Sequence, residues 1–326
     1  MKILITGCAG FIGFHLCKKI LHNKNFKVYG IDNLNSYYDV KLKKDRLKIL
    51  NKNKNFFFKK LSIENKKSIS KYLNNNKFDY LIHLAAQAGV RNSIDNPNVY
   101  FRYNVLGFYN ILNCLKNKNL KHFLFASTSS VYGNNNKFPL KENLNTNSPL
   151  SFYAATKISN EVMGFSYSNI HNIPMTALRF FTVYGPFGRP DMALFKFTKL
   201  ILENKKIQLF NKGKHYRDFT YIDDVVNSIF NLIKKPPKSK IPFRRVNIAR
   251  GESKKLLSYL KNIEKYLNKK AQKEMLGLQD GDIYKTSASV SLLKKITNYK
   301  PKVSIERGIK NFIMWFREYY KKYKNV

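Results

Sequence analysis

Cysteine is scarce in this sequence. Of 326 residues only three are cysteines, Cys8, Cys17 and Cys114, and no two of them form a C-x-x-C pair. A disulfide framework needs an even set of cysteines, and a zinc site needs paired cysteine or histidine ligands. The sequence therefore predicts neither a disulfide framework nor a metal site, and it fits a reducing compartment.

Long apolar runs are also missing. The sequence contains no uninterrupted apolar stretch of about 18 residues or more, which a membrane-spanning helix would need. The first residues, MKILITG, have the pattern of a β-strand and lack the basic start and apolar stretch of a signal peptide. We therefore expect a cytoplasmic protein that does not bind a membrane.

Acidic residues are few. The chain has 20 Asp+Glu against 60 Lys+Arg, which gives a formal net charge of +40. Such an excess can serve nucleic-acid or membrane binding. Here, however, the basic residues are mostly lysines interleaved with asparagines, as in NKNKNFFFKK (51–60). This pattern favours a compositional bias over a nucleic-acid site, although the charge would still attract small polyanionic substrates.

Short apolar segments alternate with helical patterns over the first 180 residues. Near-continuous apolar strands separated by helices are typical of an α/β fold with a parallel, doubly wound sheet that is covered on both faces. The main helices are expected at about 11–22, 97–117 and 153–171. The expected strands are 1–6, 26–32, 56–63, 79–85, 122–128 and 175–181.

Beyond residue 182 this alternation stops, and turn signals such as YGPFGRPDM and KKPPKSKIP separate shorter elements. Helices are expected near 192–204 and 253–268. The sequence therefore predicts a large domain and a smaller C-terminal one. The large domain takes residues 1–181 plus about 221–250, and the smaller one takes about 182–220 and 251–326.

Three glycines follow the first strand and open a helix, in the run TGCAGFIG (6–13). Gly7, Gly10 and Gly13 permit a tight turn and a close approach to a pyrophosphate, and the helix N-terminus offers free N–H groups. Asp32 ends the second strand, where an acid can bind an adenosine ribose and favours NAD over NADP. Since strand, glycines, helix and acid occur in this order, we predict NAD binding.

Tyr153 and Lys157 lie four residues apart at the start of a helical pattern, which puts both on one face. A phenol is a poor base near neutral pH, and a nearby ammonium would lower its pKa. Thr128, Ser129 and Ser130 close the fifth strand at the edge where open α/β sheets bind ligands. These hydroxyls either link a substrate to Tyr153 or fill the hydrogen bonds of their own turn.

Further segments extend the glycine turn and the Tyr–Lys pair into a longer pattern. They are IDNLN (31–35), HLAAQAGVR (83–91), STSSVYG (127–133), YAATK (153–157), the stretch 179–197, RDFTYIDDV (217–225) and QDGD (279–282). Together they resemble the extended short-chain dehydrogenase/reductase family over essentially the whole chain, and within it the UDP-glucuronate 4-epimerases most. The resemblance implies an NAD-dependent 4-epimerase of a UDP-hexuronate that acts through a transient 4-keto sugar. It also implies a Rossmann domain that binds NAD, a smaller domain that binds the UDP-sugar, and a homodimer.

The resemblance implies roles for individual residues. Tyr153 would be the base, Lys157 its partner and a nicotinamide-ribose ligand, and Thr128 the catalytic hydroxyl. The implied cofactor contacts, besides Tyr153 and Lys157, are Gly7, Gly10, Phe11, Ile12, Gly13, Asp32, Asn33, Ile63, Leu84, Ala85, Ala86, Gln87 and Asn104. The implied substrate contacts are Arg91, Ser129, Ser130, Thr182, Arg189, Arg217 and Asp282.

Differences from dehydratase and decarboxylase relatives indicate which reaction type the sequence favours. Dehydratase relatives carry Asp-Glu where this chain has Ser129-Ser130, and decarboxylating relatives carry Glu at the position of Ser130. The missing acids favour simple epimerisation. Thr182 with Arg189 resembles the carboxylate-recognising variant, and an Arg fork is suited to a hexuronate.

Two other functions compete with this prediction. One is a UDP-galactose or UDP-N-acetylhexosamine 4-epimerase on the same scaffold. The other is a non-enzymatic protein that binds nucleic acid through its basic surface, against which the intact Tyr153 and Lys157 argue. Ser62 stands in place of an acid often found near the adenine, and this departure would weaken NAD binding. Asp280 stands in place of the usual proline of QPGD and adds negative charge near the expected nucleotide site, for which we have no explanation.

Overall fold

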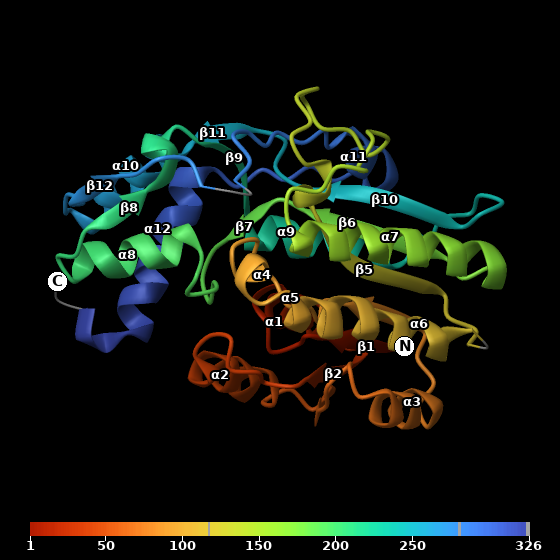
Figure 1. The fold of residues 1–326 in the computed structure, drawn as a ribbon. Helices are drawn as coiled ribbons and strands as arrows, with labels where there is room; N and C mark the ends of the chain where they lie inside the picture. Colours follow the sequence, from red (N-terminus) through yellow and green to blue (C-terminus); the bar gives the residue numbers. More distant parts are fainter. Residues whose placement is uncertain (117, 280–281, 324–326) are drawn as a thin grey trace.

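A parallel seven-stranded sheet forms the centre of the molecule (Figure 1). The computed structural model describes residues 1–116, 118–279 and 282–323. The strand order is β10-β6-β5-β4-β1-β2-β3, and every neighbouring pair is parallel. The strands are β1 (Lys2–Thr6), β2 (Lys27–Asp32), β3 (Phe56–Lys60), β4 (Tyr80–His83), β5 (His122–Thr128), β6 (Met175–Phe180) and β10 (Phe243–Ile248). The predicted doubly wound α/β fold is therefore confirmed.

Helices cover both faces of this sheet because successive side chains of each buried strand point to opposite sides. On β5, Leu124 belongs to the hydrophobic cluster that includes α1 (Phe11–Leu21) and α9 (Ile222–Ile233). Its neighbours Phe123 and Phe125 belong to the second cluster, on the other face. The helices of that cluster are α3 (Lys66–Asn74), α6 (Gly107–Leu115) and α7 (Phe152–His171).

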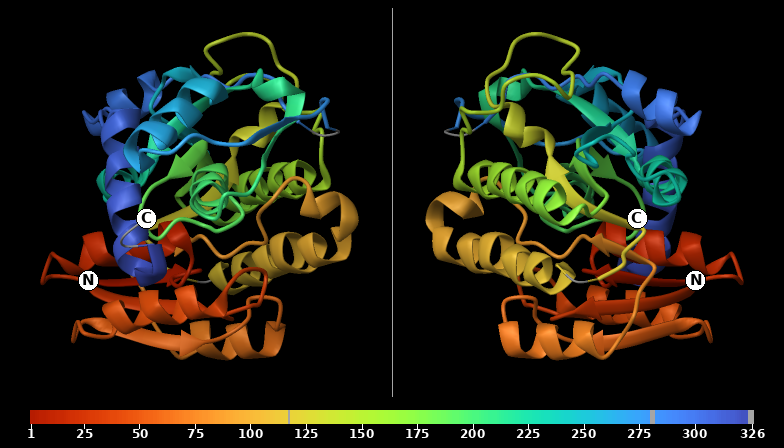
Figure 2. Two further views of the ribbon diagram at one scale, coloured as in Figure 1. Left: turned by 90° about the vertical axis from the view of Figure 1, so that its left-hand side faces the viewer. Right: turned by 90° about the vertical axis from the view of Figure 1, so that its right-hand side faces the viewer.

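The C-terminal part adds two small sheets and a group of helices. One sheet joins β7 (Thr182–Tyr184), β9 (Tyr216–Tyr221) and β11 (Ser253–Lys255), and the other joins β8 (Ile207–Leu209) and β12 (Lys273–Met275). The helices are α8 (Ala193–Leu202), α10 (Leu256–Leu267), α11 (Ser291–Thr297) and α12 (Ile305–Tyr319). In Figure 2 the blue C-terminal helices and the golden helix α6 lie on opposite sides of the molecule.

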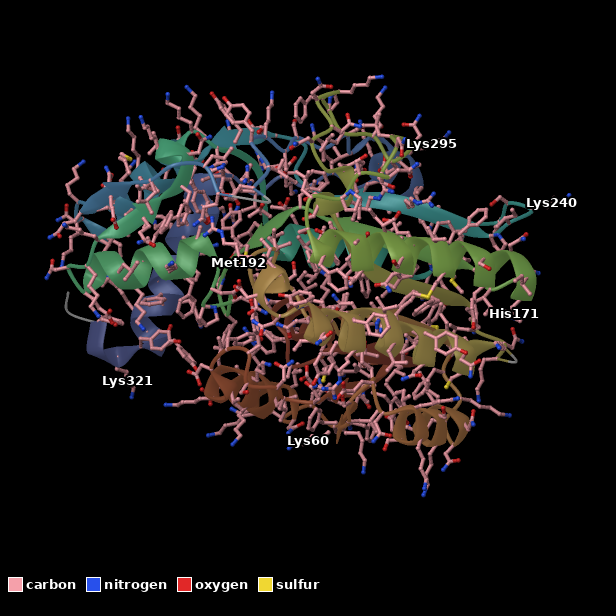
Figure 3. The ribbon with its side chains drawn as sticks, in the orientation of Figure 1. Lys60, His171, Met192, Lys240, Lys295 and Lys321 are labelled. Carbon is pink, nitrogen blue, oxygen red and sulfur yellow. The ribbon has the colours of Figure 1, made fainter. Side chains whose placement is uncertain are left out.

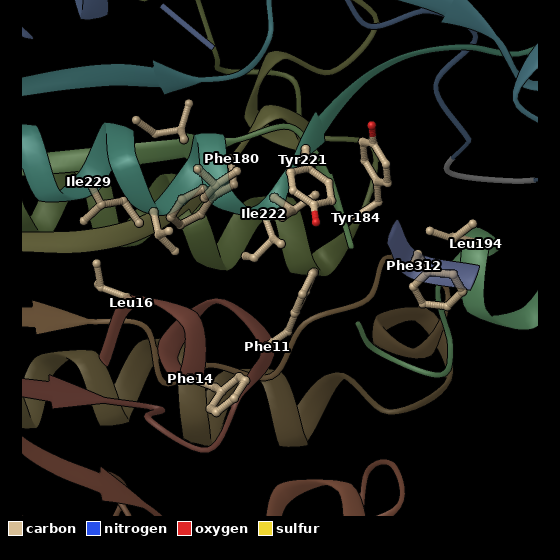
Figure 4. Packing of buried hydrophobic residues seen from close by; sticks show 14 of the residues in the cluster. Phe11, Phe14, Leu16, Phe180, Tyr184, Leu194, Tyr221, Ile222, Ile229 and Phe312 are labelled. Carbon is tan, nitrogen blue, oxygen red and sulfur yellow. The ribbon is translucent and has the colours of Figure 1, made fainter. Parts of the chain in front are cut away.

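One hydrophobic cluster continues from the large sheet into this C-terminal part. Figure 4 shows Phe11 of α1 pointing toward Ile222 of α9, with Phe312 of α12 further along the same cluster. The two parts thus share a core. The division into 1–181 plus about 221–250 and about 182–220 plus 251–326 stays a prediction, and the position of α9 and β10 at the large sheet is compatible with it.

Short elements complete the chain. They are α2 (Val40–Leu50), α4 (Asn92–Asp95), α5 (Pro97–Tyr100), the π-helical turn η1 (Phe101–Leu106), and the 3-10 turns η2 (Ser129–Tyr132), η3 (Phe210–Gly213) and η4 (Lys321–Tyr323). The helix expected at 97–117 is thus divided by a π-helical turn. Within the described residues, no helix combines the length and the apolar character that crossing a membrane would take.

The excess of lysine is spread around the molecule. Figure 3 shows nitrogen-tipped side chains on every side of the outline, with the labelled Lys60, Lys240 and Lys321 far from one another. This distribution is the one expected from a bias in composition along the whole chain.

Candidate active site

The glycine turn between β1 and α1 has no room for side chains. A Cβ atom at Gly13 would lie 2.1 Å from the carbonyl oxygen of Gly7, and one at Gly10 would lie 3.0 Å from it. Gly7 has φ +73° and its Cβ would meet the backbone of Ala85 at 2.7 Å. The first turn of α1 contains no acid, and Gly10 provides no capping side chain. A cradle with this backbone and an open positive helix end fits a pyrophosphate.

Asp32 lies beside this turn at the end of β2. Its carboxylate accepts hydrogen bonds from the backbone N–H of Leu34 at 2.8 Å and of Ala9 at 3.1 Å. Burial raises the pKa of Asp32, and these bonds together with the charges of Lys43 and Arg46 oppose the rise. The carboxylate is therefore fixed next to the phosphate-binding turn, as a group that binds ribose hydroxyls must be. The following Asn33 uses its side-chain oxygen to accept from the N–H of Asn35.

The segment after β4 forms the opposite wall of the turn. Ala85 donates its N–H to Thr6 Oγ1 at 3.1 Å. Gln87 is held by Asn104 of η1, whose side chain accepts from the Gln87 N–H and donates to the Gln87 oxygen and to Thr156 Oγ1. Asn104 is buried and fully engaged with protein groups, so it ties the predicted cofactor-lining segment to helix α7.

The other implied cofactor residues lie around these two segments. Phe11 and Ile12 begin α1, and Leu84 and Ala86 follow β4. Ile63 is different, because its side chain belongs to the core and its Cδ1 fills the space beside Gly107. Its carbonyl oxygen also accepts from Asn110 at 3.0 Å, so a role of Ile63 at the cofactor stays a prediction.

Tyr153 and Lys157 occupy the first two turns of α7, which begins at the capping residue Ser151. Lys157 is buried, its Nζ donates to the carbonyl oxygen of Ala126 at 3.1 Å, and burial lowers its pKa to about 7. Burial also raises the pKa of the Tyr153 phenol, while the Thr128 hydroxyl and the Arg189 charge lower it. This differs from the expectation that the Lys157 ammonium lowers the pKa of Tyr153, because Lys157 points at a backbone carbonyl of β5.

Thr128, Ser129 and Ser130 lie where β5 ends and η2 begins. Thr128 Oγ1 accepts from the Ser130 N–H and donates to Ser130 Oγ, both at 3.2 Å. The same hydroxyl acts on the Tyr153 phenol. The two alternatives for this hydroxyl group are thus not exclusive, since Thr128 caps its own turn and also contacts the tyrosine.

Thr182 and Arg189 line one small cavity, together with Met192, Phe219 and Phe312. Arg189 comes from the loop between β7 and α8. Its positive charge acts on Tyr153, so it lies within electrostatic range of the predicted base. A mainly apolar cavity wall that includes one arginine and a few hydroxyl-bearing residues is suited to holding a single anionic group.

Arg91, Arg217 and Asp282 lie together away from the glycine turn. Arg91 Nη2 is 3.2 Å from Asp282 Oδ2. Arg217 donates to the carbonyl oxygens of Tyr216 and Tyr284, and burial lowers its pKa to about 10. A buried guanidinium bound mainly by carbonyls retains excess positive charge, which suits phosphate groups. Asp280 of the same motif lies outside the described residues.

The sequence did not point to a buried ion network on α7, next to Lys157. Glu161 is one helical turn after Lys157, and its carboxylate accepts from Ser127 Oγ at 2.6 Å and from Arg179 at 2.9 and 2.7 Å. Arg245 of β10 also donates to it at 2.7 Å. The spacing of four residues after Lys157 was the available signal, since it predicts a shared helix face.

Known proteins share both the sequence and the fold. Residues 3–249 match the model of the NAD dependent epimerase/dehydratase family. The chain is 46% identical to Protein CapI of Staphylococcus aureus, covering 99% of this chain and 100% of that one. It is 39% identical to a UDP-glucuronate 4-epimerase of Thermodesulfobacterium geofontis, covering 97% and 96%.

A solved structure agrees with these matches. The UDP-glucuronic acid 4-epimerase from Bacillus cereus, in complex with UDP-glucuronic acid and NAD, superposes with a TM-score of 0.92 at 36% identity, covering 98% of this chain and 100% of that one. The family resemblance expected from the motifs is confirmed. The chain belongs to the NAD dependent epimerase/dehydratase family.

Proposed function

We propose that this protein is an NAD-dependent 4-epimerase that interconverts UDP-glucuronate and UDP-galacturonate. The observation that carries the proposal is the position of Arg189, whose charge acts on the Tyr153 phenol from a cavity wall shared with Thr182. A base with a fixed cation beside it fits a sugar that carries both a reactive hydroxyl and a carboxylate. The relatives named for UDP-glucuronate support the same substrate.

The glycine turn, the open end of α1 and Asp32 are the groups that would hold NAD. When bound, NAD supplies a hydride acceptor at the sugar C4 and returns the hydride within the same turnover. Tyr153 removes the proton of the sugar 4-hydroxyl and later returns one to the epimeric hydroxyl. The Thr128 hydroxyl orients the Tyr153 phenol, and together with the Arg189 charge it opposes the rise in pKa that burial causes. Lys157, one turn further along α7, would hold the nicotinamide ribose.

The substrate groups divide between two clusters. Thr182 and Arg189 bind the hexuronate carboxylate. Because the carboxylate is fixed in this way, the transient 4-keto sugar is less prone to lose CO₂. Arg91 and Arg217 bind the diphosphate, and Asp282 lies beside them. Ser129 and Ser130 add hydroxyls at the sugar and no acid, so the site lacks the extra acid that elimination of water would use.

A direct assay tests this proposal. Purified protein is incubated with UDP-glucuronate, and the products are separated, while the nucleotide released on denaturation is identified. Formation of UDP-galacturonate with NAD released is the expected result. A preference for UDP-galactose or UDP-N-acetylglucosamine as substrate would exclude the carboxylate role of Thr182 and Arg189.

Replacing Arg189 by Ala is expected to lower kcat/KM for UDP-glucuronate by at least about 10²-fold, because a charge-assisted pair worth about 3 kcal/mol is lost. Steady-state kinetics on both variants measures the effect. Arg102→Ala is the matched control, since Arg102 is an exposed arginine that forms an ion pair with Glu64. An unchanged kcat/KM for Arg189→Ala would remove Arg189 from the carboxylate site.

We also propose that the protein is a homodimer that pairs through the outer faces of η1, α6 and α7. Several large apolar side chains on these helices are exposed. They are Phe101, Leu106, Tyr109, Phe152, Val162, Phe165 and Ile170. These helices are neighbours in the fold, and exposed apolar side chains gathered on neighbouring helices are typical of a protein–protein contact, which a twofold pairing of the helices would cover.

Replacing Phe101 and Val162 together by Arg is expected to convert the dimer to a monomer, because each copy would place two new cations in a closely packed contact. Their side chains are 51% and 60% exposed, so the fold of a single copy tolerates the change. Light scattering coupled to gel filtration gives the mass. Met314→Arg on α12, at a site that is 61% exposed, is the control. A variant that keeps twice the mass of the chain would exclude this contact.

A further inference from the structure

The Arg189 side chain is already held by an acid from its own loop. Its Nε lies 3.0 Å from Asp191 Oδ1 and its Nη2 lies 2.5 Å from Asp191 Oδ2. Nη2 also donates to the carbonyl oxygen of Ala88 at 3.4 Å. A guanidinium has two edges that can bind a carboxylate with two parallel hydrogen bonds. Asp191 occupies the edge formed by Nε and Nη2, and Ala88 accepts the remaining Nη2 hydrogen, so Nη1 is the nitrogen that can donate to a ligand at the other edge.

A tyrosine from the cofactor side completes this arrangement. The Tyr37 hydroxyl donates to Asp191 Oδ2 at 3.5 Å, and its ring lies 5.8 Å from Arg189 Cζ. Burial and the Asp191 charge raise the pKa of Tyr37 to about 12, so its hydroxyl stays protonated and can donate. Gly89 leaves the space for it, because a Cβ there would lie 2.7 Å from the Tyr37 oxygen. We call Tyr37, Ala88, Arg189 and Asp191 the Arg189 clasp.

The loop that carries Arg189 has other anchors, so the clasp is not needed to place its backbone. His15 is 2.8 Å from the Pro186 oxygen, and Arg46 Nη2 donates to the Phe187 oxygen at 2.6 Å. These contacts come from α1 and α2. Asp191 instead fixes the direction of the Arg189 side chain, through two of that side chain's hydrogen bonds, and this side chain has many rotamers when it is free.

We propose that Asp191 is a positioning residue that sets the preference for a UDP-hexuronate over a neutral UDP-hexose by fixing which edge of Arg189 faces the substrate. The proposal rests on the proposed function. A fixed guanidinium binds the sugar carboxylate without first losing rotamer freedom, and binding energy is retained when such ordering is already complete. A neutral hexose makes no charge-assisted bond to this edge, so Asp191 has little effect on it.

The test is the binding preference, given by the ratio of dissociation constants for UDP-glucose and UDP-glucuronate, each measured by titration calorimetry. Asp191→Asn is expected to lower this ratio about tenfold, as expected for weakening one charge-assisted hydrogen-bonded pair. In an Arg189→Ala background the same substitution should change the ratio by less than about twofold, because Asp191 then has no guanidinium to direct. A structural defect would weaken both ligands alike and leave the ratio unchanged.

The controls separate this proposal from the proposed function. Glu274→Gln, the same chemical change at an exposed site on β12, should leave the ratio unchanged. Asp191→Ser takes the place of Asp191→Asn if the latter does not fold. If the wild-type protein binds UDP-glucuronate preferentially and Asp191→Asn keeps or increases that preference, the role of Asp191 is excluded and the proposed function stands. If the wild-type protein does not prefer UDP-glucuronate, both the role of Asp191 and the proposed function are excluded.

Discussion

Replacing Tyr153 by Phe is expected to lower kcat about 10³-fold, within the range that a positioned proton-transfer group contributes. The substitution removes only the phenol oxygen. The ring would keep its edge contact with Tyr100, whose centroid lies 6.1 Å away, and the backbone N–H of residue 153 would keep its bond to Ser93 Oγ. The site should therefore bind cofactor and substrate normally while it can no longer move the proton of the 4-hydroxyl.

Three measurements define this result. Turnover of UDP-glucuronate gives kcat, the nucleotide released on denaturation gives the cofactor content, and calorimetry gives the affinity for UDP-glucuronate. Only kcat should change, whereas the cofactor content and the affinity should stay at their wild-type values. Tyr167→Phe is the matched control, since Tyr167 lies on the same helix away from Thr128. Turnover near the wild-type value in Tyr153→Phe would show that another group takes the proton, and the assignment of Thr128 as its partner would fail as well.

The strands that the sequence predicted were those with uninterrupted apolar runs. β10 was not among them, because two arginines follow the first residue of its sequence FRRVNI. Arg244 and Arg245 look like surface residues in the sequence, yet both have partners, Arg244 at Thr176 and Arg245 at Glu161. A pattern of hydrophobicity cannot reveal a charge that is buried because its partner comes from a distant element.

The same limit applies to the site. The glycine turn and the Tyr–Lys pair were visible because their spacing along the chain is fixed by local geometry. The Arg189 clasp was not, since Tyr37 reaches Asp191 from 154 positions away. The direction of the Lys157 side chain could not be predicted from the sequence either, because it is set by a hydrogen bond to the Ala126 carbonyl of a neighbouring strand. Local motifs thus identified the reacting groups, and the contacts that orient them required the structure.

Replacing Glu161 by Gln is expected to lower the free energy of unfolding by about 3–5 kcal/mol at neutral pH, the usual cost of breaking a buried ion pair. Glu161 and Arg179 have side chains that are 2% and 1% exposed. The amide keeps the shape of the carboxyl group, but it removes the negative charge and one of the two oxygens that accept from Arg179. The buried Arg179 cation then keeps neutral partners such as the Glu142 carbonyl oxygen and the Tyr132 ring. Urea unfolding of both proteins measures the difference, with Glu274→Gln as the exposed control.

The pH dependence of that difference identifies its cause. Burial acts to raise the pKa of Glu161, but the hydrogen bonds and charge of Arg179 outweigh it, and the pKa falls below its ordinary value of 4.5. A carboxyl group with a depressed pKa in the folded protein contributes stability above pH 4.5 and loses that contribution as the pH falls through the folded value. The difference in free energy of unfolding between wild type and Glu161→Gln should therefore be constant near neutral pH. It should become smaller on acidification, because protonated Glu161 resembles glutamine. A gap that persists at low pH would instead mean that the amide disturbs packing around Ser127 and Arg179, and that the charge itself adds no stability.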